Sequence, residues 1–329
     1  MKKTVFMFIL LSVSFAKAQF IEDALRYANS QHFITSRAVG LNVSYIGISD
    51  DINALLANPA GLALIPKNEF SVGFGFSHIG NEVSILSKKS NFNVNNEYLS
   101  HLAIASPISG SNGITTVAIG YFRDNDFKKS YDYNVFNTQS SYIFQQSQAK
   151  KRWTYDLLLA DINGNTSISD SLRQTSFVDE MGGTHNITGG MGIDVGDNVS
   201  LGFSITGKWG TFEYSREFVE WDELNIYNKW QIDDFDKLIV KEKIKQNVSG
   251  ITAQFGLLGK IEDFMRISFS IKLPTWYQVD EKFSVSHDVI FDENPQGIVD
   301  RFDTTQRGSN SYNIRTPFVY SAGLSFHLL

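Results

Sequence analysis

The sequence predicts an all-β protein, an antiparallel transmembrane β-barrel that follows an N-terminal plug of short helices and turns. Three observations carry this prediction: an export signal, segments that alternate residue by residue between apolar and small polar side chains, and connections that alternate between short and long. The 329 residues include 26 Phe, 13 Tyr and 25 Gly but only 6 Pro. Such an aromatic-rich composition is typical of β-strands.

The first 18 residues have the features of a secretory signal peptide. Lys2 and Lys3 form a positive start, Val5–Ala16 is apolar, and Ala16-Lys17-Ala18 provides small residues for cleavage after Ala18. The apolar stretch is too short to span a bilayer as a helix. Together with the strand pattern, this segment predicts export to the bacterial outer membrane.

Composition also excludes several function classes. The chain has 29 Lys+Arg against 35 Asp+Glu, so no basic excess exists to neutralise the phosphates of a nucleic acid. It has no Cys, which excludes disulfides, thiolate metal sites and a cysteine nucleophile. The six His are scattered, and neither a nucleophile elbow nor a phosphate-binding loop occurs. We therefore expect no enzyme, no metal and no cofactor. The oligomeric state is left open, with a monomer as one option.

The segment Gln19–Asn68 lacks alternation and predicts short helices and turns. Ile21–Ala28 is expected to be helical, and Asp50-Asp51-Ile52-Asn53 resembles a helix N-terminus ahead of Ala54-Leu55-Leu56. Acidic side chains are favoured there by the helix dipole. We expect this segment to lie in the periplasm or to fold into the barrel as a hatch.

Residues 69–329 are expected to form the barrel, and eight segments in this region predict strands. In six of them one face is large and apolar while the other is mostly Gly, Ser or Thr, with Lys208, Arg266 and Lys272 in mid-strand. The eight segments are Phe70–Phe76, Tyr98–Ser106, Val117–Tyr121, Ile187–Val195, Val199–Trp209, Val248–Leu258, Met265–Leu273 and Phe318–Phe326.

This alternation fits two architectures. A soluble sandwich turns the apolar face inward, whereas a membrane barrel turns it outward into lipid. The connections favour the barrel, because short periplasmic turns and long exterior loops are typical of outer-membrane proteins. Three short turns (109–113, 196–198 and 259–263) alternate with four long polar connections (81–97, 123–183, 214–246 and 274–311). Further strands could be hidden in Ser130–Phe144 and Lys237–Lys245.

Two segments are candidate functional sites. Asn58-Pro59-Ala60-Gly61-Leu62 predicts a tight turn after a helix, in which Gly permits close backbone approach. The second is Lys150–Ile162, an aromatic and aliphatic patch in the longest exterior connection. One interpretation is a hydrophobic ligand groove and the other is packing of the loop onto the barrel rim. The residues expected to contact ligand are Trp153, Tyr155, Leu157, Leu158 and Leu159.

The N-terminal residues resemble the FadL/TodX family of outer-membrane transporters, in particular its "hemin receptor"-type bacterial relatives. The resemblance rests on Glu22–Tyr27, on Ser36-Arg37-Ala38-Val39-Gly40, and on Ala57–Leu62 leading into the strand at Phe70–Phe76. It implies a fourteen-stranded barrel whose lumen is blocked by a hatch. Asn58, Pro59 and Ala60 match the Asn-Pro-Ala motif of that hatch, and Gly61 and Leu62 follow the version found in the relatives. These five residues are the expected gate.

The resemblance also implies a function, the passive uptake of hydrophobic small molecules such as long-chain fatty acids or aromatic hydrocarbons. In the family, substrate binds in an outer groove, enters the lumen and leaves laterally through a kink in the wall. The expected partners are the hydrophobic solute and outer-membrane lipid. The alternative is a FadL-like, secretion-associated barrel that binds partner proteins through its exterior loops. A membrane-embedded hydrolase is a third and disfavoured class.

The predicted strand count disagrees with the resemblance. A barrel of eight strands has an interior just wide enough for its own side chains, which leaves no space for a hatch of about 50 residues. We therefore expect either hidden strands or a chain that stops before the barrel closes. In an open sheet, Phe70–Phe76 and Phe318–Phe326 are opposite edges; in a closed one they pair. The open arrangement is the expectation.

Overall fold

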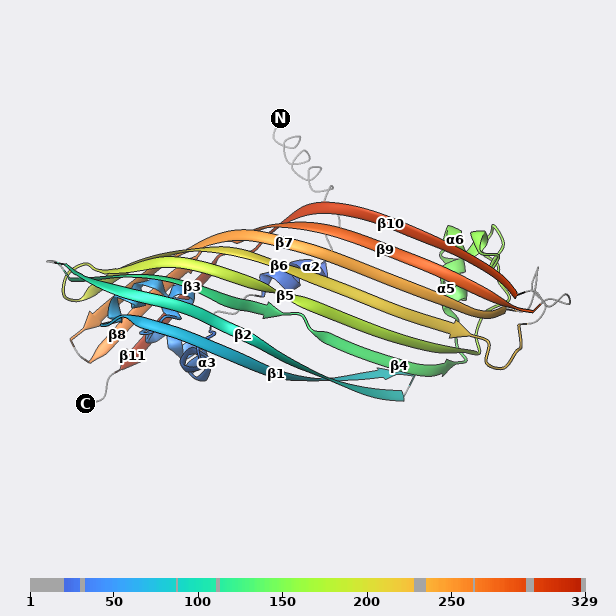
Figure 1. The fold of residues 1–329 in the computed structure, drawn as a ribbon, viewed down its shortest axis with the longest axis horizontal. Coiled ribbons are helices and arrows are strands. Elements are labelled where there is room, and N and C mark those ends of the chain that lie inside the picture. Colours follow the sequence, from blue (N-terminus) through green and yellow to red (C-terminus); the bar gives the residue numbers. More distant parts are fainter. Residues whose placement is uncertain are drawn as a thin grey trace, which may run out of the picture.

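The computed structural model describes residues 21–29, 33–86, 88–110, 113–227, 235–262, 264–293 and 299–326. These residues form one antiparallel sheet of eleven strands that curls into a half-barrel (Figure 1). A single curled sheet confirms the β-rich, barrel-like prediction, and a two-sheet sandwich does not form. The signal peptide expected at 1–18 lies outside the described residues. No helix within the described residues is long and apolar enough to cross a membrane.

The strands follow one another along the chain as antiparallel neighbours. The sheet order is β1-β2-β3-β5-β6-β7-β8-β11, with β4 paired to β5, and β9 paired to both β7 and β10. The bounds are β1 (Glu69–Ile85), β2 (Lys88–Gly110), β3 (Gly113–Asp126), β4 (Lys129–Asn137), β5 (Leu172–Asp194), β6 (Val199–Trp221), β7 (Phe235–Ile261), β8 (Met265–Lys272), β9 (Trp276–Glu293), β10 (Val299–Arg315) and β11 (Val319–Phe326).

The prediction of eight strands was wrong. Each predicted segment lies in a strand to within one residue at its ends, but β4, β9 and β10 were not among them. Ser130–Phe144 does contain most of β4, although it ends in a helix, and Lys237–Lys245 belongs to the same long strand as Val248–Leu258.

Three of the four predicted long loops were wrong, because strands continue through much of each. Segments 81–97, 214–246 and 274–311 are largely strand. In these parts the outward side chains are charged or polar, so the apolar alternation stops while the backbone ladder continues. Cross-strand ion pairs take the place of apolar side-chain contacts there, as between Lys245 and Glu213 at 2.5 Å and between Lys241 and Glu217 at 3.4 Å. The tight turn between β5 and β6 is confirmed, whereas the predicted turns at 109–113 and 259–263 include residues 111–112 and 263, which lie outside the described residues.

Two breaks between strands lie beside each other in the sheet. β8 and β9 both pair with β7 and are separated at Pro274. β11 and β10, which pair with β8 and β9, are separated at Pro317. Proline lacks the N–H that a ladder needs, so strands break at such positions. The Thr316 N–H donates to the Thr275 carbonyl at 3.1 Å, which joins the two breaks.

The sheet is open. In the part of the chain that the structure describes, β1 pairs only with β2, and β11 only with β8. Phe70–Phe76 and Phe318–Phe326 are therefore on opposite edges, as expected for the open arrangement, and the alternative in which they pair is not observed.

The two faces of the sheet are those that the alternation predicts. In the part of the sheet nearest the short turns, the convex face carries exposed large apolar side chains at alternate positions, whereas the concave face carries mostly small or polar ones that are buried. Representative exposed residues are Phe70, Phe74, Ile104, Ile119, Ile187, Leu201, Phe255 and Leu324.

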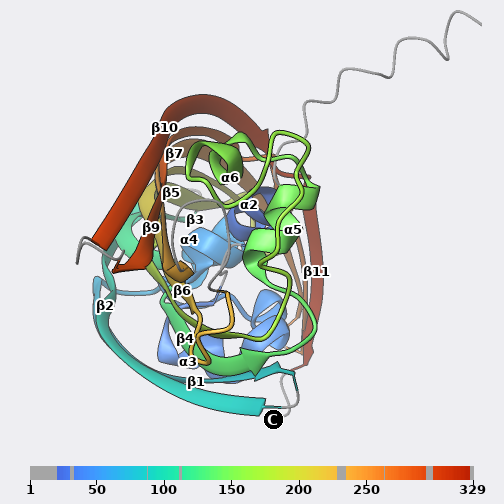
Figure 2. The same cartoon turned by 90° about the vertical axis from the view of Figure 1, so that its right-hand side faces the viewer.

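The N-terminal segment lies inside the curl (Figure 2). It consists of α2 (Ile21–Ala28), α3 (Ser36–Leu41), η1 (Asn42–Gly47), α4 (Ala54–Ala57) and η2 (Pro59–Leu64). The helices predicted at 21–28 and 54–56 are thus confirmed. Ile52, Leu55 and Leu62 pack against Ala103 and Phe122 of the sheet in one buried cluster. At the end of the half-barrel that carries the long hairpins lie α5 (Tyr142–Gln148) and α6 (Arg152–Asp156) (Figure 1).

Candidate functional site

A row of glycines crosses the concave face beneath the N-terminal segment. Gly192, Gly202 and Gly256 are register partners on β5, β6 and β7. A Cβ at Gly202 would lie 2.1 Å from the Ala60 nitrogen, and one at Gly256 would lie 2.0 Å from Asn58 Oδ1. Only glycine allows so close an approach. The row, hereafter the glycine row, therefore seats the backbone of η2 directly on the sheet.

The hatch motif predicted from the sequence occupies this seat. Asn58 ends α4 and begins η2: its Oδ1 accepts from the Ala60 N–H at 3.2 Å, and its Nδ2 donates to the Leu257 carbonyl of β7 at 3.3 Å. Pro59 occupies the first turn of η2, where its missing N–H costs nothing. Asn58, Pro59, Ala60, Gly61 and Leu62 are all buried. The predicted tight turn is confirmed, and it is a docking element for the sheet.

Strand hydroxyls and an amide hold the rest of the segment. Ser270 Oγ and Gln254 Nε2 both donate to the Ala57 carbonyl, at 2.9 and 2.7 Å. Ser204 Oγ donates to the Leu55 carbonyl at 3.0 Å. These bonds satisfy carbonyls that a one-turn helix leaves without partners. The small polar residues at alternate strand positions were the signal, but their partners could not be read from the sequence.

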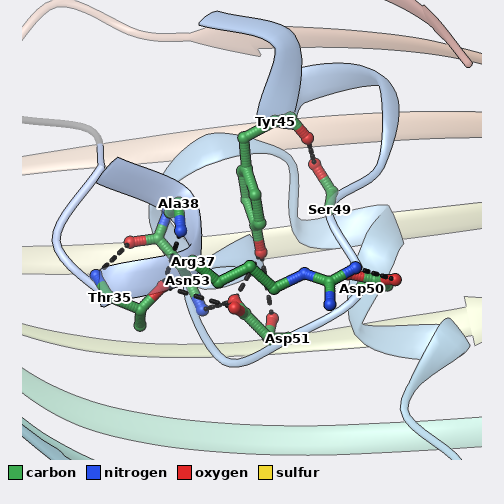
Figure 3. Close-up of polar contacts among 8 residues, drawn as sticks. All are labelled: Thr35, Arg37, Ala38, Tyr45, Ser49, Asp50, Asp51 and Asn53. Carbon is green, nitrogen blue, oxygen red and sulfur yellow. Dashed lines mark hydrogen bonds and ion pairs between the residues drawn. The ribbon is translucent and has the colours of Figure 1, made fainter. Parts of the chain in front are cut away.

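Asp51 organises the preceding turns (Figure 3). Its Oδ1 accepts from the Tyr45 hydroxyl at 2.5 Å and from the Asn53 N–H at 2.7 Å, and its Oδ2 accepts from Thr35 Oγ1 at 3.3 Å. Burial, together with the charge of Asp51, raises the pKa of Tyr45 well above its ordinary value. Asp51 of the predicted acidic pair therefore joins three parts of the N-terminal segment, and α4 itself begins at Ala54 after the N-cap residue Asn53, with no acidic residue in its first turn.

Beyond the N-terminal segment, the concave face carries a buried ion pair. Lys208 Nζ and Asp124 Oδ2 are 2.5 Å apart and both side chains are 1% exposed. Thr184 Oγ1 donates to the same carboxylate at 3.3 Å. A cavity of about 360 Å³ separates the N-terminal segment from β8 and β11. Its lining is mainly apolar, including Phe33, Val43, Ile46, Leu56, Val319 and Ala322, with Gln254, Ser270 and Lys272 as its polar members.

The wall is split between β2 and β3. Their ladder ends at the pair His101 and Phe122; farther along, β2 pairs only with β1, while β3 and β4 pair only with β5 in the described part of the chain. We call the boundary between residues 88–100 of β2 and residues 123–137 of β3 and β4 the seam. No backbone ladder crosses the seam within the described residues.

Side chains bridge the seam in place of the ladder. Asn96 Nδ2 donates to Asp126 Oδ2, and Lys128 Nζ donates to the Asn95 carbonyl at 2.9 Å. Farther from the N-terminal segment, Ser90 Oγ donates to Asp132 Oδ1 at 3.0 Å. These are side-chain hydrogen bonds, so the seam can separate without breaking a backbone ladder bond of the sheet.

The second predicted site is packed against the strands. Trp153, Leu157 and Leu159 are buried in a cluster with side chains of β6, β7 and β9, and Leu158 packs on its border. Tyr155 alone of the five is largely exposed. The packing interpretation thus describes this structure, and contact of these residues with a hydrophobic ligand stays a prediction.

A buried carboxylate that the sequence did not indicate anchors this loop. Glu220 on β6 accepts hydrogen bonds from the Tyr142 and Ile143 N–H groups at 2.8 and 3.2 Å, and from Gln174 Nε2 at 2.6 Å. Burial raises the pKa of Glu220 above its ordinary value, despite the three donors that lower it. We call the segment 138–171 with α5 and α6 the cap.

Comparison of the sequence with protein-family models gives no match, and comparison with curated proteins gives none at a significant level. Within the described residues, no group of three or more His, Asp or Glu is placed to hold a metal ion.

Proposed function

We propose that this chain belongs to an outer-membrane protein for the passive uptake of hydrophobic small molecules, of the long-chain fatty acid or aromatic hydrocarbon class. The observation that carries the proposal is the seating of Asn58–Leu62 on the glycine row, on the concave side of a sheet whose convex side is apolar. A sheet that is apolar outside and occupied inside is suited to a gated path through a membrane.

The outer face supports the membrane setting. Every second residue of β1 from Phe70 to Phe76 is a large exposed apolar side chain, and Phe74 is 83% exposed. Monomeric soluble proteins rarely expose continuous apolar patches of this extent. Strands of 14–23 residues, such as β3 and β6, exceed the 9–11 residues that a tilted crossing needs.

The N-terminal segment supports gating. It fills the concave side near the short turns and adjoins the cavity that contains Lys272. Its contacts with the sheet are apolar packing, hydrogen bonds in which at least one partner is a side chain, and close backbone approaches at glycine, rather than ladder pairs. Displacing it therefore leaves the sheet's own hydrogen bonds intact, as a hatch requires.

The seam supports a lateral exit. A solute that is poorly soluble in water gains by passing from the concave side directly into the bilayer. In the described half-barrel, the interrupted ladder between β2 and β3 offers such a passage, closed by the contacts of Asn96, Lys128 and Ser90.

A disulfide lock tests this route. The natural sequence has no Cys, so the pair Asn96→Cys and Asp126→Cys can be introduced across the seam without competing thiols. We expect oxidation to abolish uptake of a radiolabelled long-chain fatty acid by cells, and reduction to restore it. Heat-modifiable gel migration reports that the protein is folded in both states.

A matched pair provides the control. Glu213→Cys and Lys245→Cys join register partners of β6 and β7 that the ladder already holds together. Oxidation of this pair should leave uptake unchanged. Uptake that persists in the oxidised seam variant would refute the lateral route, and a wild-type protein that supports no uptake of any hydrophobic solute would refute the proposed function.

A further inference from the structure

A groove of about 680 Å³ lies across four strands of the half-barrel. Its outward-facing lining comes from two register rows. One row runs from Gly207 through Ile251 and Trp276 to Arg315, and the next comprises Trp209, Ser249, Gln278 and Asn313. The groove is thus on the convex face, away from the N-terminal segment. Its volume is within the range of small-molecule sites.

Gly207 and Ser249 are the small outward residues of the groove, Ile251 lies between Gly207 and Trp276, and two indoles flank them. A Cβ at Gly207 would approach only Ile187 Cγ2, at 3.7 Å, so the space above this glycine is open. Trp209 and Trp276 stand on either side, 41% and 47% exposed. Glycine here is not required for close packing, in contrast to the glycine row, and its effect is to leave the space above this position of β6 open.

The groove lies at the border of the apolar band. On β6 the outward residues Leu201, Phe203 and Ile205 are apolar, whereas beyond Trp209 they are Thr211 and Glu213. Tryptophans are enriched at this level of membrane proteins, because the indole is apolar along most of its surface and polar at its N–H. The acyl chains of a lipid bound here would continue along the apolar band.

One cation faces this groove. The Arg315 guanidinium lies over the Trp276 ring at 5.6 Å, is exposed, and forms no ion pair within the described residues. The acidic side chain on the adjacent row, Asp280, accepts from Ser311 Oγ at 2.7 Å instead. Arginine binds phosphate oxygens in pairs through its planar donors.

We propose that this groove binds an anionic, phosphate-bearing lipid, with its phosphate on Arg315 and its glycerol and first acyl carbons between Trp209 and Trp276. The inference rests on the membrane setting of the proposed function. It does not depend on transport, because the groove is on the opposite face from the N-terminal segment.

Native mass spectrometry of the detergent-purified full chain tests the site. Phosphatidylglycerol and phosphatidylcholine are added at equal concentration, and the retained lipid is counted as detergent is stripped. We expect one tightly retained phosphatidylglycerol. Arg315→Gln removes the charge, and Gly207→Phe fills the groove; each should reduce that retention about tenfold.

Two control variants leave the groove intact. Gly189→Phe places the same ring on the convex face of β5, where nothing lies within 4 Å of the added Cβ. Arg301→Gln removes an exposed arginine on β10 that is paired with Asp288. Both should retain lipid as the wild type does.

Equal retention by wild type, Arg315→Gln and Gly207→Phe, all with native heat-modifiable migration, would overturn the site. Equal retention of the two lipids by wild type would overturn its charge selectivity. If a variant does not fold, its mass-spectrometry comparison is replaced by a measurement on the wild type, the quenching of tryptophan fluorescence by brominated phosphatidylglycerol. Quenching no greater than that by brominated phosphatidylcholine overturns the proposal. Loss of uptake in the transport assay leaves every one of these outcomes unaffected.

Discussion

The imidazole of His287 stacks on the indole of Trp153, with ring centroids 3.9 Å apart and ring planes 18° apart. His287 is on β9 and Trp153 is on α6, so this contact joins the cap to the sheet. His287 is 4% exposed, and its Nδ1 has no hydrogen-bond partner among the residues that the structure describes. Burial lowers the pKa of His287 from 6.5 to about 4. The closed cap therefore requires the neutral imidazole.

The first prediction is that acid opens the cap. Because the pKa of His287 is lower in the closed state than in the open one, the open state takes up the proton first. The free energy by which the neutral His287 favours the closed cap over the open one is fully present above pH 6.5 and declines as the pH falls toward 4. The lowered pKa of His287 corresponds to about 3 kcal/mol of this free energy. Hydrogen exchange of the amides in α5 and α6 should accelerate over that interval.

A phenylalanine variant isolates the cause. His287→Phe keeps a ring against Trp153 but cannot be protonated. Its exchange in α5 and α6 should not accelerate as the pH falls from 6.5 to 4, after correction for the intrinsic rate. A variant that keeps the full pH dependence of wild type would show that another group is responsible.

The second prediction concerns Glu220. Glu220→Ala leaves the N–H groups of Tyr142 and Ile143 without their acceptor, and hydrogen bonds to a charged group contribute about 1.5–3 kcal/mol each. We expect limited proteolysis to cut the cap much faster in this variant, with the sheet still intact. Glu217→Ala on the same strand, which removes only an exposed pair with Lys241, should behave as wild type. Equal cleavage of both variants would contradict the anchoring role.

The strands that alternation predicted share one physical property. Along Phe70–Phe76 and Phe318–Phe326 the outward side chains are apolar, so the period of two is visible in the sequence. Along β10, most residues on both faces are polar, as at Arg307, Ser309 and Asn310, so no periodic signal remains. β10 is specified by its pairing with β9. This pairing is a tertiary interaction, and the pattern of residues within β10 alone cannot reveal it.

The candidate sites were likewise only partly predictable from the sequence. The turn at Asn58-Pro59 was predictable, because Asn and Pro act on their own backbone. Its seat was not predictable, since Gly192, Gly202 and Gly256 come together only through the register of three strands. Likewise, the composition of Lys150–Ile162 revealed an apolar patch, but only the fold shows that Trp153 and Leu157 face the sheet.

The third prediction tests the glycine row. In Gly202→Val the new Cβ would collide with Ala60 N and with the Pro59 carbonyl carbon, each 2.1 Å away, so the N-terminal segment must leave its seat. We expect the conductance of the variant in planar bilayers to rise to that of a protein lacking residues 19–68. Gly189→Val, on the open convex face, should conduct as wild type. Unchanged conductance in the folded deletion protein would refute the hatch.

The fourth prediction concerns the pair formed by Lys208 and Asp124, which are 2.5 Å apart and almost completely buried. Asp124→Ala leaves the ammonium of Lys208 buried without its carboxylate, and removing one partner of a buried pair costs about 3–5 kcal/mol. The exposed pair of Arg301 and Asp288 should contribute no more than about 1 kcal/mol when Arg301→Ala is made. The free energy of unfolding in urea, followed in detergent by heat-modifiable migration, measures both.

The double variant Asp124→Leu with Lys208→Met separates the attraction within this pair from the cost of an isolated charge. If the cost comes from an isolated buried charge, replacing both partners by apolar side chains of similar size should recover most of the loss. Thr184 then loses an acceptor, because its Oγ1 donates to Asp124 at 3.3 Å, so recovery should be incomplete by about 1 kcal/mol. A double variant as unstable as Asp124→Ala alone would instead assign the cost to lost packing between β3 and β6.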